Sequence, residues 1–464
     1  MITPTPGTPV PAPDPTANDD SLPAELTLPP TPWRWRLAIA AIVAAVGGAA
    51  YLLHESFPGS VRYRFQAGAG IICFLGVAAL CSKSLQSVSR KTLLWGIGLQ
   101  VILAVAVIHS RQVQVVFEAI GTGIKALITA SDKGAEFIFG SLAKVDGPSG
   151  FVFAFKALPP IIFVSAFFSV LYYLGILQLL VRLMARVMMY LMGTSGAETL
   201  SVSANVFMGQ TEAPLIVKPF VPRMTRSELL ALMASGMAHI SGGMMAVYIS
   251  YGADPVAILT TCVMACPCAL YLTKLIQPEA GRPVTAGTAP VTVETPYVNV
   301  IDAAAAGVKD GLWLALNVAA MLIAFIAFIA LFDIILGGMY TGLTLDRIFG
   351  WVFAPVAFLL GVEPAECGKV GNLLGIKLAA NEHVAYLKLK EWKTIPDYLS
   401  PRSQLLAVYA LTGFANFASV GIQLGGIGAI APGRRADLAR LGMKALFIGF
   451  LATLLNAAVA GVLM

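Results

Sequence analysis

The sequence is poor in charged residues. Only 12% of its 464 residues are charged, whereas 57% are hydrophobic, and the mean hydropathy is +0.79. Because soluble domains carry about 25% charged residues, this composition excludes a soluble enzyme and predicts an all-α polytopic membrane protein surrounded by lipid. The net charge of +6 fits cytoplasmic loops rich in Lys and Arg, and it requires no nucleic-acid partner.

Motifs for the use of ATP are missing as well. Neither a Gly-x4-Gly-Lys-Ser/Thr loop nor an Asp-Lys-Thr-Gly-Thr motif occurs, which disfavours transport driven by ATP. The six cysteines lie mostly in apolar runs, which favours buried free thiols over disulfides. Cys266-Pro-Cys268 resembles the thiolate pair that binds Cu(I) in copper-pumping ATPases, so a metal-transporting ATPase-like protein stays an alternative interpretation.

The first 32 residues lack the basic segment of a signal peptide and are rich in proline, so we expect 1–32 to be a disordered tail. Arg34 and Arg36 then place the N-terminus in the cytoplasm, and the alternation of spans places the C-terminus in the periplasm of a bacterial inner membrane. The run 151–180 should be one tilted span kinked at Pro159-Pro160, and 110–150 should include interfacial helices. Nine apolar runs are expected to cross the bilayer: 37–53, 65–81, 93–109, 151–180, 229–251, 255–275, 312–337, 404–430 and 441–464.

A polar block, Gln210-Thr211-Glu212, interrupts this apolar pattern between Gly209 and Pro214. A carboxylate at mid-bilayer depth costs roughly 2.5–3.5 kcal/mol, so it normally serves a function and has a partner. The bracketing glycine and proline favour a re-entrant backbone that lines a cavity. We interpret the block as half of a solute site, the alternative being a polar network that only pins a hairpin.

A second polar centre lies at Asn381-Glu382, within a stretch that glycines and Pro364 interrupt. Its carboxylate suits vicinal hydroxyls such as those of a ribose, unless it forms a salt bridge with Lys377. The sequence from Arg226 to Ala231 matches that from Arg402 to Ala407, and each copy follows one of the polar centres. The sequence therefore predicts about nine transmembrane helices plus two re-entrant hairpins in an inverted repeat, an arrangement typical of transporters.

The order of these features divides the chain into six segments. They are the tail (1–32), an extra N-terminal membrane helix (33–58), N-terminal helices that are mainly scaffold (59–190), a first transport repeat with hairpin 1 (191–275), a loop and a scaffold helix (276–344), and a second transport repeat with hairpin 2 (345–464).

Three further features of the spans are candidates for the site. Asn416 and Ser419 share a helix face, and Phe414 offers a ring for packing, although ordinary helix packing explains such residues equally well. His239 is an imidazole inside a span, which indicates either a group that responds to protons or a hydrogen-bonded packing residue.

Taken together, these motifs resemble the concentrative nucleoside transporter family over about residues 60–464. The resemblance implies a homotrimer that imports nucleosides with a cation, using two hairpins and two partly unwound helices. It also implies that the base lies near Gln210, Thr211, Glu212 and Met244, and the ribose near Glu382, Phe414, Asn416 and Ser419. The motifs that carry it are Gly209-Gln-Thr-Glu-Ala-Pro-Leu215, Met224-Thr-Arg-Ser-Glu228, Gly375-x-Lys-x-x-x-Asn-Glu382-x-Val-Ala-Tyr386 and Tyr409-Ala-Leu-x-Gly-Phe-Ala-Asn416.

The coupling ion is left open by the same resemblance. It implies a sodium site at Asn205, the Met208 backbone, position 239 and the Ile240 backbone, with no other metal and no cofactor. The family usually has Ser or Thr at position 239, whereas this chain has His239, a poor ligand for a cation that prefers oxygen. Proton coupling is therefore an alternative to sodium coupling. His383 also departs from the family pattern, which has Phe at this position. For the function as a whole, a nucleoside receptor that does not transport is a further alternative.

Overall fold

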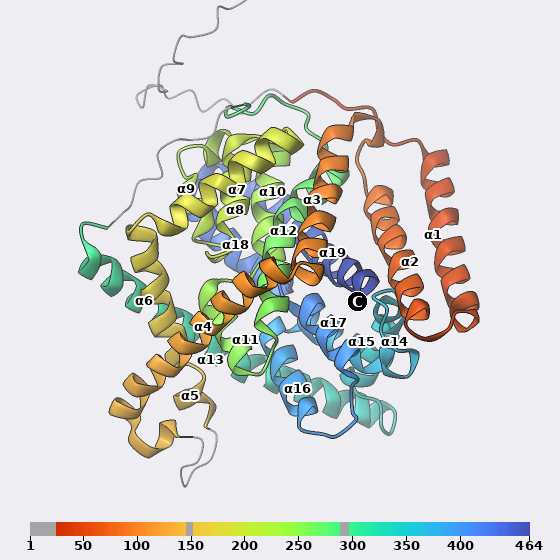
Figure 1. Cartoon of the computed structure of the whole chain (residues 1–464). Helices are drawn as coiled ribbons and strands as arrows, with labels where there is room; N and C mark the ends of the chain where they lie inside the picture. Colours follow the sequence, from red (N-terminus) through yellow and green to blue (C-terminus); the bar gives the residue numbers. More distant parts are fainter. Residues whose placement is uncertain (1–24, 145–151, 288–296) are drawn as a thin grey trace, which may run out of the picture.

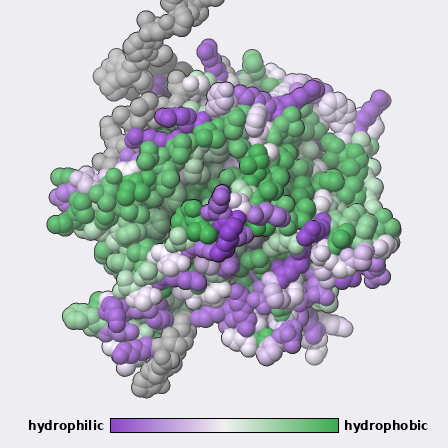
Figure 2. Space-filling model, viewed as in Figure 1, coloured by the Kyte–Doolittle hydropathy of each residue, from purple (hydrophilic) through white to green (hydrophobic). Residues whose placement is uncertain are grey.

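The computed structural model describes residues 25–144, 152–287 and 297–464, and every regular element in these ranges is a helix (Figure 1). A broad band of apolar residues crosses the molecule between two more polar ends (Figure 2). Within the described ranges, nine helical stretches are long and apolar enough to cross a membrane. The all-α polytopic fold class is thereby confirmed.

The nine stretches differ from the nine predicted runs at two places. Arg111–Ala143, which contains α4 (Arg111–Phe139), qualifies by length and composition, although we expected interfacial helices there. The predicted span 404–430 does not qualify, because residues 412–416 form a longer break that separates it into α17 (Pro401–Leu411) and α18 (Phe417–Ile430). Each half of that broken helix is too short to cross a bilayer alone.

The span expected at 151–180 is confirmed over Phe153–Tyr173, but its extension to 180 and its kink at the two prolines are wrong. The described part of this region forms a short helix, α5 (Phe153–Lys156), followed by α6 (Pro159–Tyr173) and α7 (Ile176–Met192). Pro159 and Pro160 start α6 instead of kinking a longer helix, since proline fits the first turn of a helix, where its missing N–H is not needed. Gly175, with a φ of 81°, then ends it, because only glycine adopts this left-handed backbone readily.

Two hairpins, each followed by a broken helix, form the centre of the molecule. Hairpin 1 comprises α8 (Gly196–Ala204) and α9 (Ala213–Ile216), and it leads to α10 (Arg226–Ala238) and α11 (Gly242–Ser250). Hairpin 2 comprises α15 (Cys367–Ala379) and α16 (Glu382–Lys393), and it leads to α17 and α18. This is the pattern that the repeated sequence predicts.

The two copies start at opposite ends of α19 (Arg435–Leu463). At the start of α19, the guanidinium of Arg226 lies 3.3 Å from the carboxylate of Asp437. At its other end, Arg402 donates a hydrogen bond of 2.6 Å to the carbonyl of Gly461. Since Arg226 and Arg402 are the first residues of the matching sequences, the repeat is inverted.

The remaining long helices pack in pairs around this centre. Helix α1 lies against α2, α2 against α19, α3 against α12, α6 against α13, and α14 against α15 (Figure 1). Most of α12 is buried, whereas only a few residues of α13 are. The bounds are α1 Trp33–Leu53, α2 Gly59–Leu80, α3 Arg90–His109, α12 Pro255–Ile276, α13 Val300–Met339 and α14 Leu345–Phe358.

Part of the predicted tail makes defined contacts. The carboxylate of Glu25 accepts a hydrogen bond from the Arg226 amide, and the Leu26 amide donates to the Ala280 carbonyl. The Thr31 hydroxyl donates to the carbonyl of Ser82. Residues 1–24 of that prediction lie outside the described residues.

Candidate functional site

The tip of hairpin 2 and the breaks of both interrupted helices carry polar N-caps. Ser241 caps α11, Asn381 caps α16 and Asn416 caps α18, each accepting a hydrogen bond from a backbone amide three residues later. These caps satisfy amides that a broken helix leaves without partners, which is why short polar residues recur at such positions. Asn416 therefore belongs to a break, and not to the face of a continuous helix as the sequence indicated.

A buried chain of hydrogen bonds joins four of the predicted nucleoside residues. Gln210 donates to the hydroxyl of Ser419 over 3.2 Å, and the Ser419 amide donates to the side chain of Asn416 over 2.8 Å. Asn416 in turn donates to one carboxylate oxygen of Glu382 over 3.0 Å, and the hydroxyl of Tyr248 donates to the other over 2.8 Å. Hairpin 1, hairpin 2 and the two broken helices therefore meet at one polar centre.

Glu212 lies outside this chain. It faces a cavity of about 700 Å³ between hairpin 1 and the pair α6–α13, and its carboxylate accepts a hydrogen bond of 3.0 Å from the Gly209 amide. Glu382, by contrast, is only 3% exposed and does not line this cavity. The two predicted acids thus occupy neighbouring but distinct surroundings. The cavity wall opposite Glu212 is aromatic and polar and includes Phe168, Ser169, Tyr172, Tyr297 and Asp310.

The other predicted nucleoside residues are close to these elements. Met244 is buried in the first turn of α11, and Thr211 approaches Gly426 of α18 so closely that a β-carbon there would lie 2.6 Å from its methyl group. Phe414 follows Gly413, whose φ is 147° and whose added β-carbon would lie 2.7 Å from the side chain of Thr453. Glycine is therefore required at the second break.

Lys377 does not form a salt bridge with Glu382, which was the alternative to a functional role for that carboxylate. Its ammonium group donates to the Ala410 carbonyl over 2.7 Å and to the Thr453 hydroxyl over 2.8 Å. The carboxylate of Glu382 takes its hydrogen bonds from neutral donors instead.

The predicted cation residues lie at the first break and beside it. The side-chain amide of Asn205 donates to the Ser235 hydroxyl over 3.0 Å. The side-chain oxygen of Asn205, Oδ1, is buried and accepts no hydrogen bond from any described residue. His239 donates from Nδ1 to the Ser235 carbonyl over 2.8 Å, because a carbonyl can only accept. The orphaned Asn205 oxygen suits a cation, whereas the His239 ring turns a nitrogen, not an oxygen, toward its neighbours.

Family models match most of the chain. The Na+ dependent nucleoside transporter N-terminus matches residues 69–142, the nucleoside recognition model matches 154–255, and the Na+ dependent nucleoside transporter C-terminus matches 257–461. An uncharacterized transporter of Haemophilus influenzae is 40% identical over 84% of this chain and 96% of its own length. The chain belongs to the concentrative nucleoside transporter family.

Other members of the concentrative nucleoside transporter family agree with this assignment. The Mus musculus sodium/nucleoside cotransporter 1 is 39% identical over 85% of this chain, which spans 63% of the mouse protein. The solved structure of CNTnw in an inward-facing substrate-bound state is 37% identical, with a TM-score of 0.82 over 86% of this chain and 98% of that one. A CNTnw variant in an outward-facing state matches with a TM-score of 0.80.

The two cysteines of the Cys-Pro-Cys motif do not converge in this nucleoside transporter family member. Cys266 contacts Nε2 of His239 at 3.4 Å, whereas Cys268 donates to the hydroxyl of Tyr271. All six cysteines are free, as predicted. Among the described residues, no group of three or more His, Cys, Asp or Glu is arranged to hold a metal ion. The motif therefore gives no support to a copper pump.

His383 now has a physical explanation. Its Nε2 lies 3.0 Å from the hydroxyl of Tyr251, and its ring packs edge-on against Phe153 and Tyr251. The sequence showed only that a histidine replaces the aromatic residue usual in concentrative nucleoside transporters. The imidazole keeps the aromatic packing and adds one polar contact.

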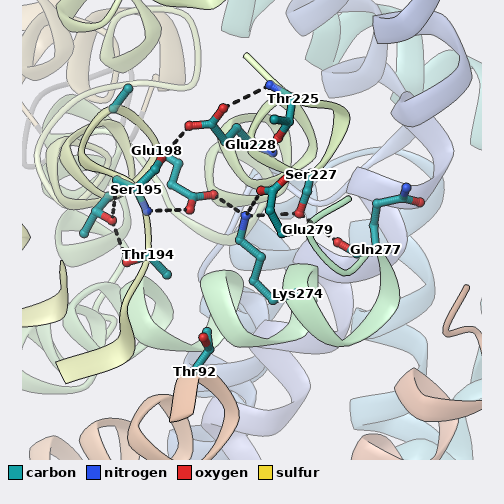
Figure 3. Close-up of polar contacts among 12 residues, drawn as sticks. Thr92, Thr194, Ser195, Glu198, Thr225, Ser227, Glu228, Lys274, Gln277 and Glu279 are labelled. Carbon is teal, nitrogen blue, oxygen red and sulfur yellow. Dashed lines mark hydrogen bonds and ion pairs between the residues drawn. The ribbon is translucent and has the colours of Figure 1, made fainter. Parts of the chain in front are cut away.

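A buried charge cluster near the base of hairpin 1 escaped the sequence analysis. The ammonium group of Lys274 lies 2.7 Å from a Glu198 oxygen and 3.0 Å from both a Glu279 oxygen and the Ser227 hydroxyl (Figure 3). The carboxylate of Glu228 accepts a hydrogen bond from the hydroxyl of Ser195 beside this cluster. The capping boxes Ser195-x-x-Glu198 and Thr225-x-x-Glu228 were the signal that could have revealed it.

Proposed function

We propose that this chain imports nucleosides across a bacterial inner membrane, driven by the gradient of a cotransported cation. The observation that carries this proposal is the hydrogen-bonded chain from Gln210 to Glu382, which draws both hairpins and both broken helices to one polar centre. Half-helices that converge on a site inside the membrane are the usual architecture of secondary transporters.

In this proposal, polar groups of the two hairpins exchange partners when a nucleoside binds. Gln210, Thr211 and Glu212 offer an amide, a hydroxyl and a carboxylate to the base, with Met244 packing beside it. Glu382, Asn416 and Ser419 take the ribose hydroxyls, and Phe414 packs against the ligand.

The cavity beside Glu212 is the proposed route to the cytoplasm. Lys218 among its lining residues, with Arg223 and Arg226 after hairpin 1, supports a cytoplasmic location for this side of the molecule under the positive-inside rule.

In this proposal the N-terminus is cytoplasmic and the C-terminus periplasmic, because the start of α1 and the end of α19 lie on opposite sides. Glu25, before α1, contacts Arg226 near the start of α19, whereas Arg64, after the end of α1, donates to the carbonyl of Met464. The largely exposed surface of α13 is the proposed contact between subunits of a homotrimer, where its apolar residues would be covered.

The experiment that tests the proposal is uptake of radiolabelled uridine and adenosine into proteoliposomes under separate sodium and proton gradients. Concentration of either nucleoside above its external level, abolished by collapsing the gradient, is the expected result. Binding without accumulation would instead make the protein a receptor, and equal uptake with and without gradients would exclude coupling.

The coupling ion depends on position 239. We expect His239→Ser to strengthen the sodium dependence of uptake, because the hydroxyl restores an oxygen ligand beside the orphaned oxygen of Asn205. The measurement is the sodium concentration that gives half-maximal uridine uptake, compared between the variant and the natural chain.

A matched control is His383→Phe, which alters a buried imidazole outside the proposed cation site. It should leave the sodium dependence unchanged. An identical sodium dependence in His239→Ser and the natural chain would remove position 239 from the ion site.

A further inference from the structure

A tyrosine and an asparagine together hold the carboxylate that the proposed function assigns to the ribose. Tyr248 is fully buried on α11, and its hydroxyl donates to Glu382 over 2.8 Å. Asn416 donates to the second oxygen of the same carboxylate over 3.0 Å. With both oxygens held from different helices, the Glu382 carboxylate has a defined plane, and its remaining lone pairs have a defined direction.

Tyr248 is itself fixed by a second tyrosine. Its ring stacks on that of Tyr386, with ring centres 4.2 Å apart and planes 13° apart. The hydroxyl of Tyr386 lies 2.8 Å from that of Thr412 and donates to the carbonyl of Val408. A stacked ring with a tethered neighbour loses little further freedom, so its hydroxyl is already positioned for Glu382.

We propose that Tyr248 is a positioning residue that sets how Glu382 discriminates ribose hydroxyls. This inference rests on the proposed function, since it requires that Glu382 bind the sugar. Tyr248 does not contact the nucleoside in this role. It aims the carboxylate, and hydrogen bonds to ribose hydroxyls depend steeply on that direction.

The matched pair of variants is Tyr248→Phe and Tyr251→Phe. Both tyrosines are buried near the end of the same helix, but the hydroxyl of Tyr251 pairs with His383 and not with Glu382. Each change removes one oxygen atom and keeps the ring, so both variants should fold alike. The measurement is the ratio of kcat/KM for uridine to that for 3′-deoxyuridine, supported by equilibrium binding of uridine in detergent.

We expect Tyr248→Phe to raise the Kd for uridine about 10- to 100-fold, because a misdirected Glu382 carboxylate loses about one charged hydrogen bond to a ribose hydroxyl. In Tyr248→Phe, the ratio of kcat/KM for uridine to that for 3′-deoxyuridine should fall at least to the square root of its value in the natural chain. Tyr251→Phe should leave this ratio unchanged. A purely structural role would weaken both nucleosides equally and preserve the ratio, which would overturn the inference.

The outcome also separates this inference from the proposed function. If Glu382→Gln abolishes uridine binding while Tyr248→Phe still discriminates fully between uridine and 3′-deoxyuridine, only the role of Tyr248 is wrong. If Glu382→Gln binds uridine normally, the assignment of the sugar site itself fails. Should Tyr248→Phe not reach the membrane, Tyr386→Leu supplies the second test. It removes the ring on which Tyr248 stacks, which frees the Tyr248 hydroxyl from its fixed direction toward Glu382, and it must then shift the same ratio.

Discussion

Glu382→Gln is expected to abolish nucleoside uptake while the protein still reaches the membrane. The carboxylate accepts hydrogen bonds from Tyr248 and Asn416, and in the proposed function it also accepts from two ribose hydroxyls. An amide group presents donors where these partners also donate, so the sugar loses its acceptor. Two lost hydrogen bonds to a charged group cost about 3–6 kcal/mol, or roughly 10²- to 10⁴-fold in affinity.

The measurement is initial uridine uptake in proteoliposomes that contain equal amounts of each protein. Glu391→Gln is the matched control, because Glu391 lies on the same helix, α16, but is exposed. It should transport normally. Uptake by Glu382→Gln within a few-fold of this control would contradict the sugar assignment.

Lys274→Met is expected to destabilise the protein strongly. It leaves the buried carboxylate of Glu198 and the partly exposed carboxylate of Glu279 without their shared cation, next to the carboxylate of Glu228 (Figure 3). Removing one partner of a buried ion pair typically costs about 3–5 kcal/mol, because an uncompensated charge stays behind. The measurement is the thermal unfolding midpoint in detergent.

The control for this second variant is Lys444→Met. The ammonium group of Lys444 donates a long hydrogen bond of 3.4 Å to the amide oxygen of Gln277, in the same part of the molecule. The double change Lys274→Met with Glu198→Gln should recover part of the loss, since it removes one of the stranded charges. Equal midpoints for Lys274→Met and Lys444→Met would show that the cluster does not stabilise hairpin 1.

The sequence predicts the helices and the breaks well, because both depend on local chemistry. The polar centres at 210–212 and 381–382 stand out against apolar surroundings, and the repeated stretches starting at Arg226 and Arg402 reveal the inverted pairing. The boundary at Gly175 was missed, since an apolar glycine inside an apolar run resembles the glycines that membrane helices tolerate.

Contacts between distant segments could not be predicted in the same way. Nothing local to Cys266 indicates that its sulfur meets His239, and nothing local to Tyr248 indicates that its hydroxyl meets Glu382. That Glu212 and Glu382 bind the same ligand stays a prediction, because Glu212 lines the cavity whereas Glu382 is buried and does not line it. Side-chain direction decides such questions, and it follows from the packed arrangement of helices.

The amide of Phe414 donates a hydrogen bond of 3.1 Å to the carbonyl of His239. This bond joins the unwound segment of one repeat to that of the other, so a backbone shift at one break must either break the bond or move the other segment. Both partners are main-chain atoms, and replacing either side chain leaves the bond intact unless proline at 414 deletes the donor. In the proposed transport cycle, this main-chain bond therefore couples the movements of the two breaks whichever side chains they carry.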